Sequence, residues 1–278
     1  MKNKGFTLIE LMIVICIMAI ISITIVTMYS GLTKSTTDQR RKIVMQQNGR
    51  AALRFISNEL LTAGYSPGGY AEDKIIMAET DSIIFNKPDP DTGNQVRCQI
   101  SMNADNELVW TNINNGTSDV ILENVAAFSM IYGIDRQNAG SDGFGELERT
   151  TGGNIAWASS TSDCIYSPGA KPCTLTSTYY YDAENLLRQG STEVMTSDPT
   201  KKPVPITGVS INRIRAVKII LLVRSDGRKH NQNLPSRTDF RFPDPKSDDG
   251  FIPPSSLDSS FRYKHFTTTV KLRNMYYL

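Results

Sequence analysis

The sequence predicts an α+β protein in which one long N-terminal helix packs on a mostly antiparallel β-sheet head with long loops. Two observations indicate the helix: the chain has no proline before Pro67, and apolar residues recur at helical spacing after an unbroken apolar run. A third observation indicates the sheet. Beyond Pro67 the chain consists of short β-type segments separated by Gly, Pro, Asn and Asp, which is typical of strands joined by turns.

Residues 1–5 form a short basic leader, and residues 6–33 form an apolar segment long enough to span a membrane. Its first 23 residues, up to Met28, already suffice for a bilayer, whereas a removed signal peptide has an apolar region of roughly 7–15 residues. Lys2 and Lys4 in the leader favour a cytoplasmic N-terminus. We therefore expect a single-pass membrane protein whose head lies outside the cytoplasm.

Glu10 is the only charged side chain in the apolar segment. A helix would place this carboxylate about one turn inside the hydrocarbon edge, where an unpaired charge costs several kcal/mol. Nothing downstream in the segment can neutralise it. The partner is therefore expected to be the free amine of a processed chain start or a group on another subunit.

Residues 34–64 read as an amphipathic continuation of the same helix. This stretch is polar, contains no proline, and has only Gly49 as a weak helix former before its end. We expect its buried face to contain Ala52, Phe55, Ile56 and Leu60. Gly64 is the expected stop, which gives a helix of about 87 Å at about 1.5 Å per residue.

Residues 65–278 are expected to form one β-rich globular head on the second half of the helix. The alternating and apolar segments predict strands at residues 75–77, 83–85, 96–100, 108–111, 125–132, 178–181, 214–223 and 266–272. Two long loops, residues 135–153 and 226–260, have little periodic pattern. Such loops are either partner-contacting surfaces or mobile decoration.

The segment 214–223 is the clearest predicted strand, because apolar residues occupy both of its faces. This pattern predicts a central strand covered on both sides, with the helix on one of them. One face would contain Val217, Ile219, Leu221 and Val223, and the other Ala216, Ile220 and Leu222. In the last strand, Phe266, Val270 and Leu272 are expected to point inward.

Cysteine placement fits an oxidising compartment on this topology. Cys164 and Cys173 are nine residues apart across a turn-rich segment, which predicts a small disulfide loop. Cys98 would then be unpaired, although pairing of Cys98 with either of the other two stays open. Cys16, in the apolar segment, is expected to be an apolar filler.

Signals for catalysis, cofactors or metals are nearly absent. The chain has two histidines, neither in an HExxH arrangement, and no GxSxG motif or phosphate-binding glycine loop. Residues 89–94 space oxygen ligands somewhat like a Ca²⁺ loop, but a hairpin turn explains them better. The 30 basic and 28 acidic residues become 28 of each without Lys2 and Lys4, which argues against general nucleic-acid binding. We expect no enzyme activity, cofactor, metal or nucleic-acid partner.

The sequence Gly5-Phe-Thr-Leu-Ile-Glu10 resembles the type IV prepilin junction. The resemblance implies that a prepilin peptidase cuts between Gly5 and Phe6 and methylates the new N-terminal Phe6. It also implies that Glu10 neutralises the Phe6 ammonium of a neighbouring subunit. Two buried charges then cancel only when the register of the helices is right.

Four further stretches are similar to the PilW-type minor pilins and to the related J-type pseudopilins of type II secretion. They are Gln47–Tyr65 with its Asn-Gly-Arg and Ala-Gly-Tyr signatures, Tyr179–Arg188, and the two closing strands around residues 215–225 and 262–274. The resemblance implies a minor pilin that primes pilus assembly near the tip. The alternatives are a J-type pseudopilin of a secretion or DNA-uptake pseudopilus, or a membrane-anchored adhesin or enzyme.

The implied partners are other minor pilins, the major pilin, the prepilin peptidase and the inner-membrane assembly platform. The implied location is the inner membrane before assembly, with the head outside the cytoplasm, and the pilus or pseudopilus afterwards.

Overall fold

The computed structural model describes residues 7–65, 74–90, 92–135, 147, 155–159, 177–181, 187–190, 193–194, 204–205, 211–227, 257–258 and 260–272. These form one α-helix, thirteen strands and a short 3₁₀ turn. The bounds are α1 Leu8–Thr62, β1 Ile75–Ala78, β2 Ser82–Pro88, β3 Gln95–Met102, β4 Leu108–Asn112, β5 Thr117–Leu122, β6 Val125–Ile134, β7 Trp157–Ser159, β8 Ser177–Tyr181, β9 Leu187–Gly190, β10 Glu193–Val194, β11 Val204–Pro205, η1 Ile211–Arg213, β12 Ile214–Arg224 and β13 Tyr263–Lys271.

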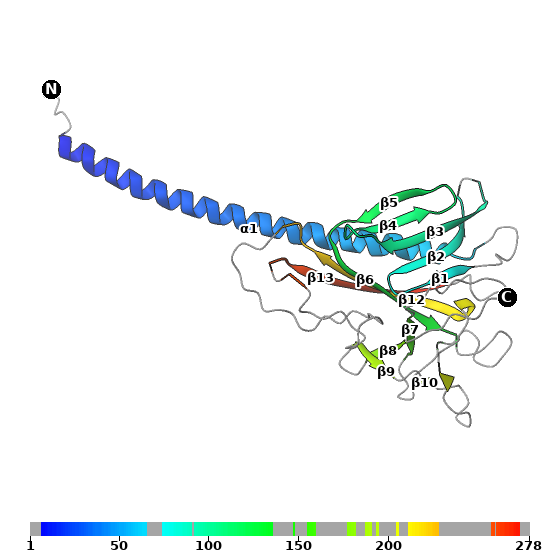
Figure 1. Cartoon of the computed structure of the whole chain (residues 1–278). Coiled ribbons are helices and arrows are strands. Elements are labelled where there is room, and N and C mark those ends of the chain that lie inside the picture. Colours follow the sequence, from blue (N-terminus) through cyan, green and yellow to red (C-terminus); the bar gives the residue numbers. More distant parts are fainter. Residues whose placement is uncertain are drawn as a thin grey trace.

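Helix α1 is a single element of 55 residues, about 82 Å long at about 1.5 Å per residue. Its N-terminal half extends away from the head, and its C-terminal half lies along the strands (Figure 1). The helix ends at Thr62, Ala63 is its C-cap residue, and Gly64 follows with φ +72°. Only glycine adopts this backbone freely, and the Gly64 amide donates to the Asn86 carbonyl at 2.8 Å. The predicted stop at Gly64 is confirmed.

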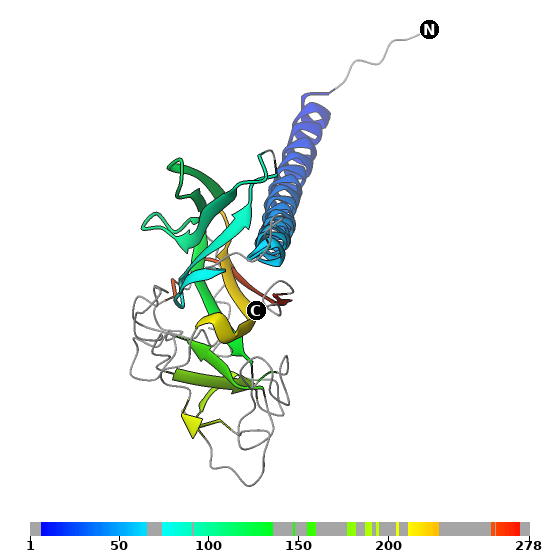
Figure 2. The same ribbon diagram turned by 90° about the vertical axis from the view of Figure 1, so that its right-hand side faces the viewer.

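The strands form two larger antiparallel sheets where the sequence predicted one. The first sheet is a meander with the order β1-β2-β3-β4-β5, and the second has the order β13-β12-β6-β7-β8-β9. In Figure 1 the C-terminal half of α1 lies beneath strands β4 and β5 of the first sheet and above strand β13 of the second. Figure 2 shows that both sheets gather at one end of the helix.

Both sheets share one hydrophobic core with the helix. That core joins Ile56 and Leu60 of α1 to Phe85 of β2, Phe128 of β6 and Phe266 of β13. A fully buried tyrosine, Tyr132 of β6, further connects the sheets, because its hydroxyl donates to the Glu79 carbonyl in the β1–β2 turn. The second half of the helix is therefore part of the head's core and not a flexible tether.

Strand β12 is the central strand that the sequence predicted. Its Val217, Ile219, Leu221 and Val223 lie in the core shared with α1. Its Ala216, Ile220 and Leu222 lie in a second cluster on the opposite face, together with Trp157. The inward residues of β13 are also confirmed, since Phe266, Val270 and Leu272 are all buried.

Other expectations differ from the structure. Phe55 is 41% exposed, and the buried stripe of α1 consists of Met45, Gly49, Ala52, Leu53, Ile56 and Leu60. Phe55 lies on the flank of that stripe, beyond the reach of the strands. The sequence also missed β5, β7, β9, β10 and β11. Strand β5 is the last strand of its sheet and mostly exposed, so it lacks the apolar alternation that identifies half-buried strands.

Gly49 marks the closest approach of the helix to the sheet. A Cβ at this position would lie 2.4 Å from Cε2 of Phe266. Both residues belong to buried parts of α1 and β13, so the ring has little freedom to move away. The absence of a side chain at Gly49 lets β13 pack directly on the helix.

We expect Gly49→Ala to lower the unfolding temperature of the full-length chain in detergent micelles. Overpacking costs typically about 1–3 kcal/mol, which exceeds the about 1 kcal/mol that alanine gains in helix propensity. Circular dichroism would measure the shift. The exposed Gln47 supplies a control, Gln47→Ala, with little expected change. In a Phe266→Ala background, Gly49→Ala should leave the unfolding temperature unchanged or raise it. If Gly49→Ala raised the unfolding temperature of the native chain, the packing argument would be contradicted.

Candidate assembly surface

The first half of α1 exposes an apolar surface over its whole circumference. Residues 8–33 are all exposed in the described structure, and their large apolar side chains are about half exposed or more. By length and composition this part of the helix can cross a membrane. Such a surface requires lipid or other apolar helices around it.

Glu10 lies at the start of this apolar surface and closes the N-terminus of the helix. The Thr7 amide and Thr7 hydroxyl both donate to Glu10 Oε2, at 2.9 and 2.8 Å. In return, the Glu10 amide donates to Thr7 Oγ1 at 3.4 Å. This is a reciprocal capping box, which satisfies amides that the first turn leaves without partners.

The capping box leaves part of the Glu10 carboxylate available. Oε2 accepts both bonds from Thr7, and Oε1 accepts none from the residues that the structure describes. Thr7 would survive a cut between Gly5 and Phe6, so a processed chain could keep the cap and still offer Oε1 to an ammonium group. Gly5 and Phe6 themselves lie outside the described residues.

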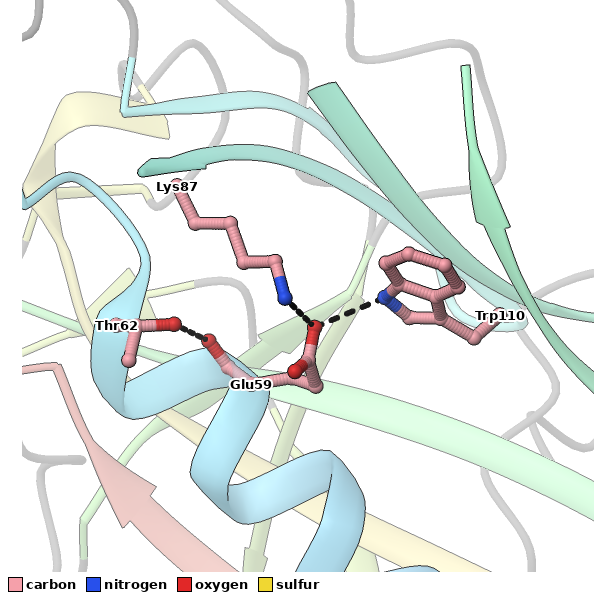
Figure 3. Close-up of polar contacts among 4 residues, drawn as sticks. All are labelled: Glu59, Thr62, Lys87 and Trp110. Carbon is pink, nitrogen blue, oxygen red and sulfur yellow. Dashed lines mark hydrogen bonds and ion pairs between the residues drawn. The ribbon is translucent and has the colours of Figure 1, made fainter. Parts of the chain in front are cut away.

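A second carboxylate, Glu59, fixes the other end of α1 to the first sheet (Figure 3). Its Oε2 accepts from Lys87 Nζ of β2 at 2.7 Å and from Trp110 Nε1 of β4 at 2.9 Å. The Lys87 ammonium also lies 5.2 Å from the centroid of the Trp110 ring, within cation–π range. Thr62 shares the same turn, and its hydroxyl donates to the Glu59 carbonyl at 2.8 Å.

Asp38 makes the matching contact near the middle of the helix. Its Oδ2 accepts from Arg262, next to the start of β13, at 2.9 Å. Asp38 and Glu59 are 21 residues apart in sequence, about 31 Å along the helix at about 1.5 Å per residue. The head is thus held to α1 by an ion pair at each end of the contact.

Further polar contacts lie within the described part of the head. A buried ion pair joins Asp135 to Arg215 Nε at 2.9 Å between β6 and β12, where it has a structural function. No group of His, Cys, Asp and Glu among the described residues could hold a metal ion. The turn between β2 and β3 closes through the Asp89 amide and the Asn94 carbonyl at 2.8 Å, as the hairpin interpretation predicted.

Cys98 is a free and fully buried thiol on β3. Burial raises the pKa of this thiol to about 11, so it stays protonated and unreactive at neutral pH. Cys164 and Cys173 lie outside the described residues, and the disulfide between them stays a prediction.

Comparisons with known proteins agree with this geometry. The family model of the type IV pilus-assembly protein W matches residues 93–274, which is more than half of the chain. The chain belongs to the PilW family. A second model, the prokaryotic N-terminal methylation motif, matches residues 1–26 of this PilW-family chain.

Further comparisons add less. No curated protein matches the sequence. Among solved structures, the fold is similar to a type IV-like pilin from Thermus thermophilus, with a TM-score of 0.43 and 11% identity. That alignment covers 84% of this chain and 98% of the other.

The sequence singled out Glu10 but did not identify its cap or the two ion pairs that join α1 to the head. One signal was available for these ion pairs: Asp38 and Glu59 are the only acidic residues between residues 34 and 62. Isolated carboxylates on a basic helix are candidates for specific pairing. Their partners are distant in sequence, so the pairs themselves could not be named.

We expect Glu59→Gln to destabilise the head by about 1–3 kcal/mol, because hydrogen bonds to charged groups are worth about that much when partly buried. Lys87 would lose its counter-ion, with its side chain only 13% exposed. Denaturant unfolding followed by tryptophan fluorescence measures this, since Trp110 reports on the same contact.

The neighbouring, exposed Asn58 gives a matched control, Asn58→Gln, which should unfold like the native chain. Lys87→Met combined with Glu59→Gln should cost less than the sum of the two single changes. Additive costs would show that the pair does not act as one contact.

Proposed function

We propose that this PilW-family chain is a minor pilin of a type IV pilus, present in few copies near the filament tip, where it helps to prime assembly. The observation that carries the proposal is a membrane-length helix, preceded by a prepilin motif, that continues without a break into the core of the head. A subunit built this way transmits the position of its helix directly to its head.

The proposed route begins with the prepilin peptidase. It cuts between Gly5 and Phe6, and Phe6 becomes the methylated start of a chain anchored in the inner membrane with its head outside the cytoplasm. Glu10 then neutralises the Phe6 ammonium of a neighbouring subunit through the carboxylate oxygen that Thr7 leaves open. Burial of both charges is tolerable only when they pair.

The function is tested by capturing the full-length processed chain from membranes in mild detergent. A minor pilin should co-purify with other minor pilins of the same system, and a deletion strain should lose most surface pili. A deletion strain that keeps its pili but loses secretion of exported proteins would instead indicate a J-type pseudopilin. Normal pili and secretion, with loss of one binding or hydrolytic activity, would overturn both assembly functions.

The assembly function of Glu10 is separable from its capping function. Glu10→Gln keeps a side-chain acceptor suited to a capping box but removes the charge, whereas Thr7→Ala removes the cap and keeps the charge. We expect Glu10→Gln to leave the mature mass unchanged and to reduce incorporation into the minor-pilin complex at least about tenfold. The Phe6 ammonium of the neighbouring subunit would then be unpaired, and an unpaired charge in an apolar environment costs several kcal/mol. Thr7→Ala should assemble nearly normally.

Incorporation is measured as the ratio of assembled to membrane-resident chain on immunoblots, with mature mass as the check on processing. If Thr7→Ala lowered incorporation as strongly as Glu10→Gln, the cap and not the charge would explain the requirement for Glu10.

A further inference from the structure

The second half of α1 is strongly unbalanced in charge. Between residues 34 and 62 it carries two acids and six bases. Both acids, Asp38 and Glu59, bind cations of the head. The six bases are Lys34, Arg40, Arg41, Lys42, Arg50 and Arg54. None of these six has an ion-pair partner within the part of the chain that the structure describes.

Four of the six bases lie directly beyond the apolar segment. Lys34 follows its last residue, Thr33, and Lys42 lies nine residues beyond Thr33, about 13 Å farther along the helix axis. The headgroup layer on one side of a bilayer is about 5–8 Å thick. Electrostatic attraction extends about 10 Å farther at an ionic strength of 0.1 M. All four cations are therefore within reach of the headgroups on the side of the head.

These four residues, which we call the basic collar, point in three directions around the helix. At about 100° per residue, Arg40, Arg41 and Lys42 point about 240°, 340° and 80° away from Lys34. A protein partner contacts a helix from one side. A headgroup layer surrounds a helix that leaves the membrane, so its phosphates can meet cations that point in several directions.

We propose that the basic collar binds anionic phospholipid headgroups on the membrane face next to the head. The ligand chemistry is a phosphodiester in a lipid of net negative charge, to which guanidinium and ammonium groups donate charge-assisted hydrogen bonds. Three of the four collar residues, Lys34, Arg40 and Lys42, are exposed. The fourth, Arg41, packs its guanidinium against Gly227 and is half-buried.

The acids that the structure describes near the collar form no ion pair with it. Asp38 is engaged by Arg262. A groove of about 660 Å³ between α1 and the ends of β5 and β12 is lined by Arg40 and Arg41 and also by Glu123 and Asp226. Neither acid makes an ion pair with either arginine in the described structure. The cations on the helix are thus available to lipid even where the head comes close.

The collar is tested with the full-length chain in nanodiscs that contain an equimolar mixture of phosphatidylglycerol and phosphatidylcholine. Native mass spectrometry counts the lipids of each kind that stay bound. The native chain should retain phosphatidylglycerol over phosphatidylcholine by about fivefold or more, the factor that corresponds to the about 1 kcal/mol contributed by one basic residue near an anionic surface. Raising the salt concentration should reduce this preference.

A matched pair of variants locates the effect. Arg40→Gln with Lys42→Gln should abolish most of the preference. Arg50→Gln with Arg54→Gln removes the same charge from the same helix, but 17 and 21 residues beyond Thr33, about 25 and 31 Å away, and should leave the preference intact. Equal helicity by circular dichroism checks that both variants are folded.

Two results would overturn the proposal. One is a lipid result: either both double variants lose the preference equally, or the native chain shows no preference. The other is photocrosslinking from position 40 that captures an acidic protein and no lipid, which would assign the collar to a protein interface. Neither result bears on the pilus assignment, because the collar requires only that α1 be anchored in a membrane.

Discussion

The packing of the second half of α1 into the head is the constraint on which the rest of the structure depends. The two sheets form one core only because Ile56, Leu60 and their neighbours fill the space between them. Gly49 brings β13 onto the helix surface, and Asp38 and Glu59 hold the two ends of the contact. A head built around its own anchor cannot rotate independently of the membrane segment. Any position imposed on the helix by its neighbours is therefore imposed on the head.

This arrangement also determines which charges remain on the outside of the helix. The head binds both acids of residues 34–62, and five of the six bases of this stretch are exposed. A surface ion pair contributes little when it is fully solvated. Glu59 is instead sheltered by Lys87 and the Trp110 ring. Its two directed hydrogen bonds favour one rotation of the helix against the first sheet. That specificity follows from polar geometry, since the apolar stripe alone would tolerate some rotation.

The sequence predicted those parts of the fold that repeat a local pattern. Strand β12 was recognisable because both of its faces are apolar, and Gly64 because a helix end needs a residue that accepts positive φ. It failed where the outcome depends on distant residues. Phe55 has suitable spacing but no strand opposite it, and Lys87 and Trp110 lie 28 and 51 residues from Glu59. Of the assembly surface, Glu10 was identified because a lone acid in an apolar run is anomalous by itself. Its cap was overlooked, although Thr7 three residues before Glu10 is the sequence signature of a capping box.

The apolar segment is bounded by charge at both ends, with Glu10 on one side and Lys34 on the other. They are 24 residues apart, about 36 Å along the helix, close to the about 30 Å of a hydrocarbon core with some tilt. In a bilayer both ends can reach polar groups. In the proposed assembly of helices both would need partners, an ammonium for Glu10 and anions for the collar. A neighbour that offered only one of them would leave a charge unpaired, and that penalty discriminates among subunits more sharply than apolar contact does.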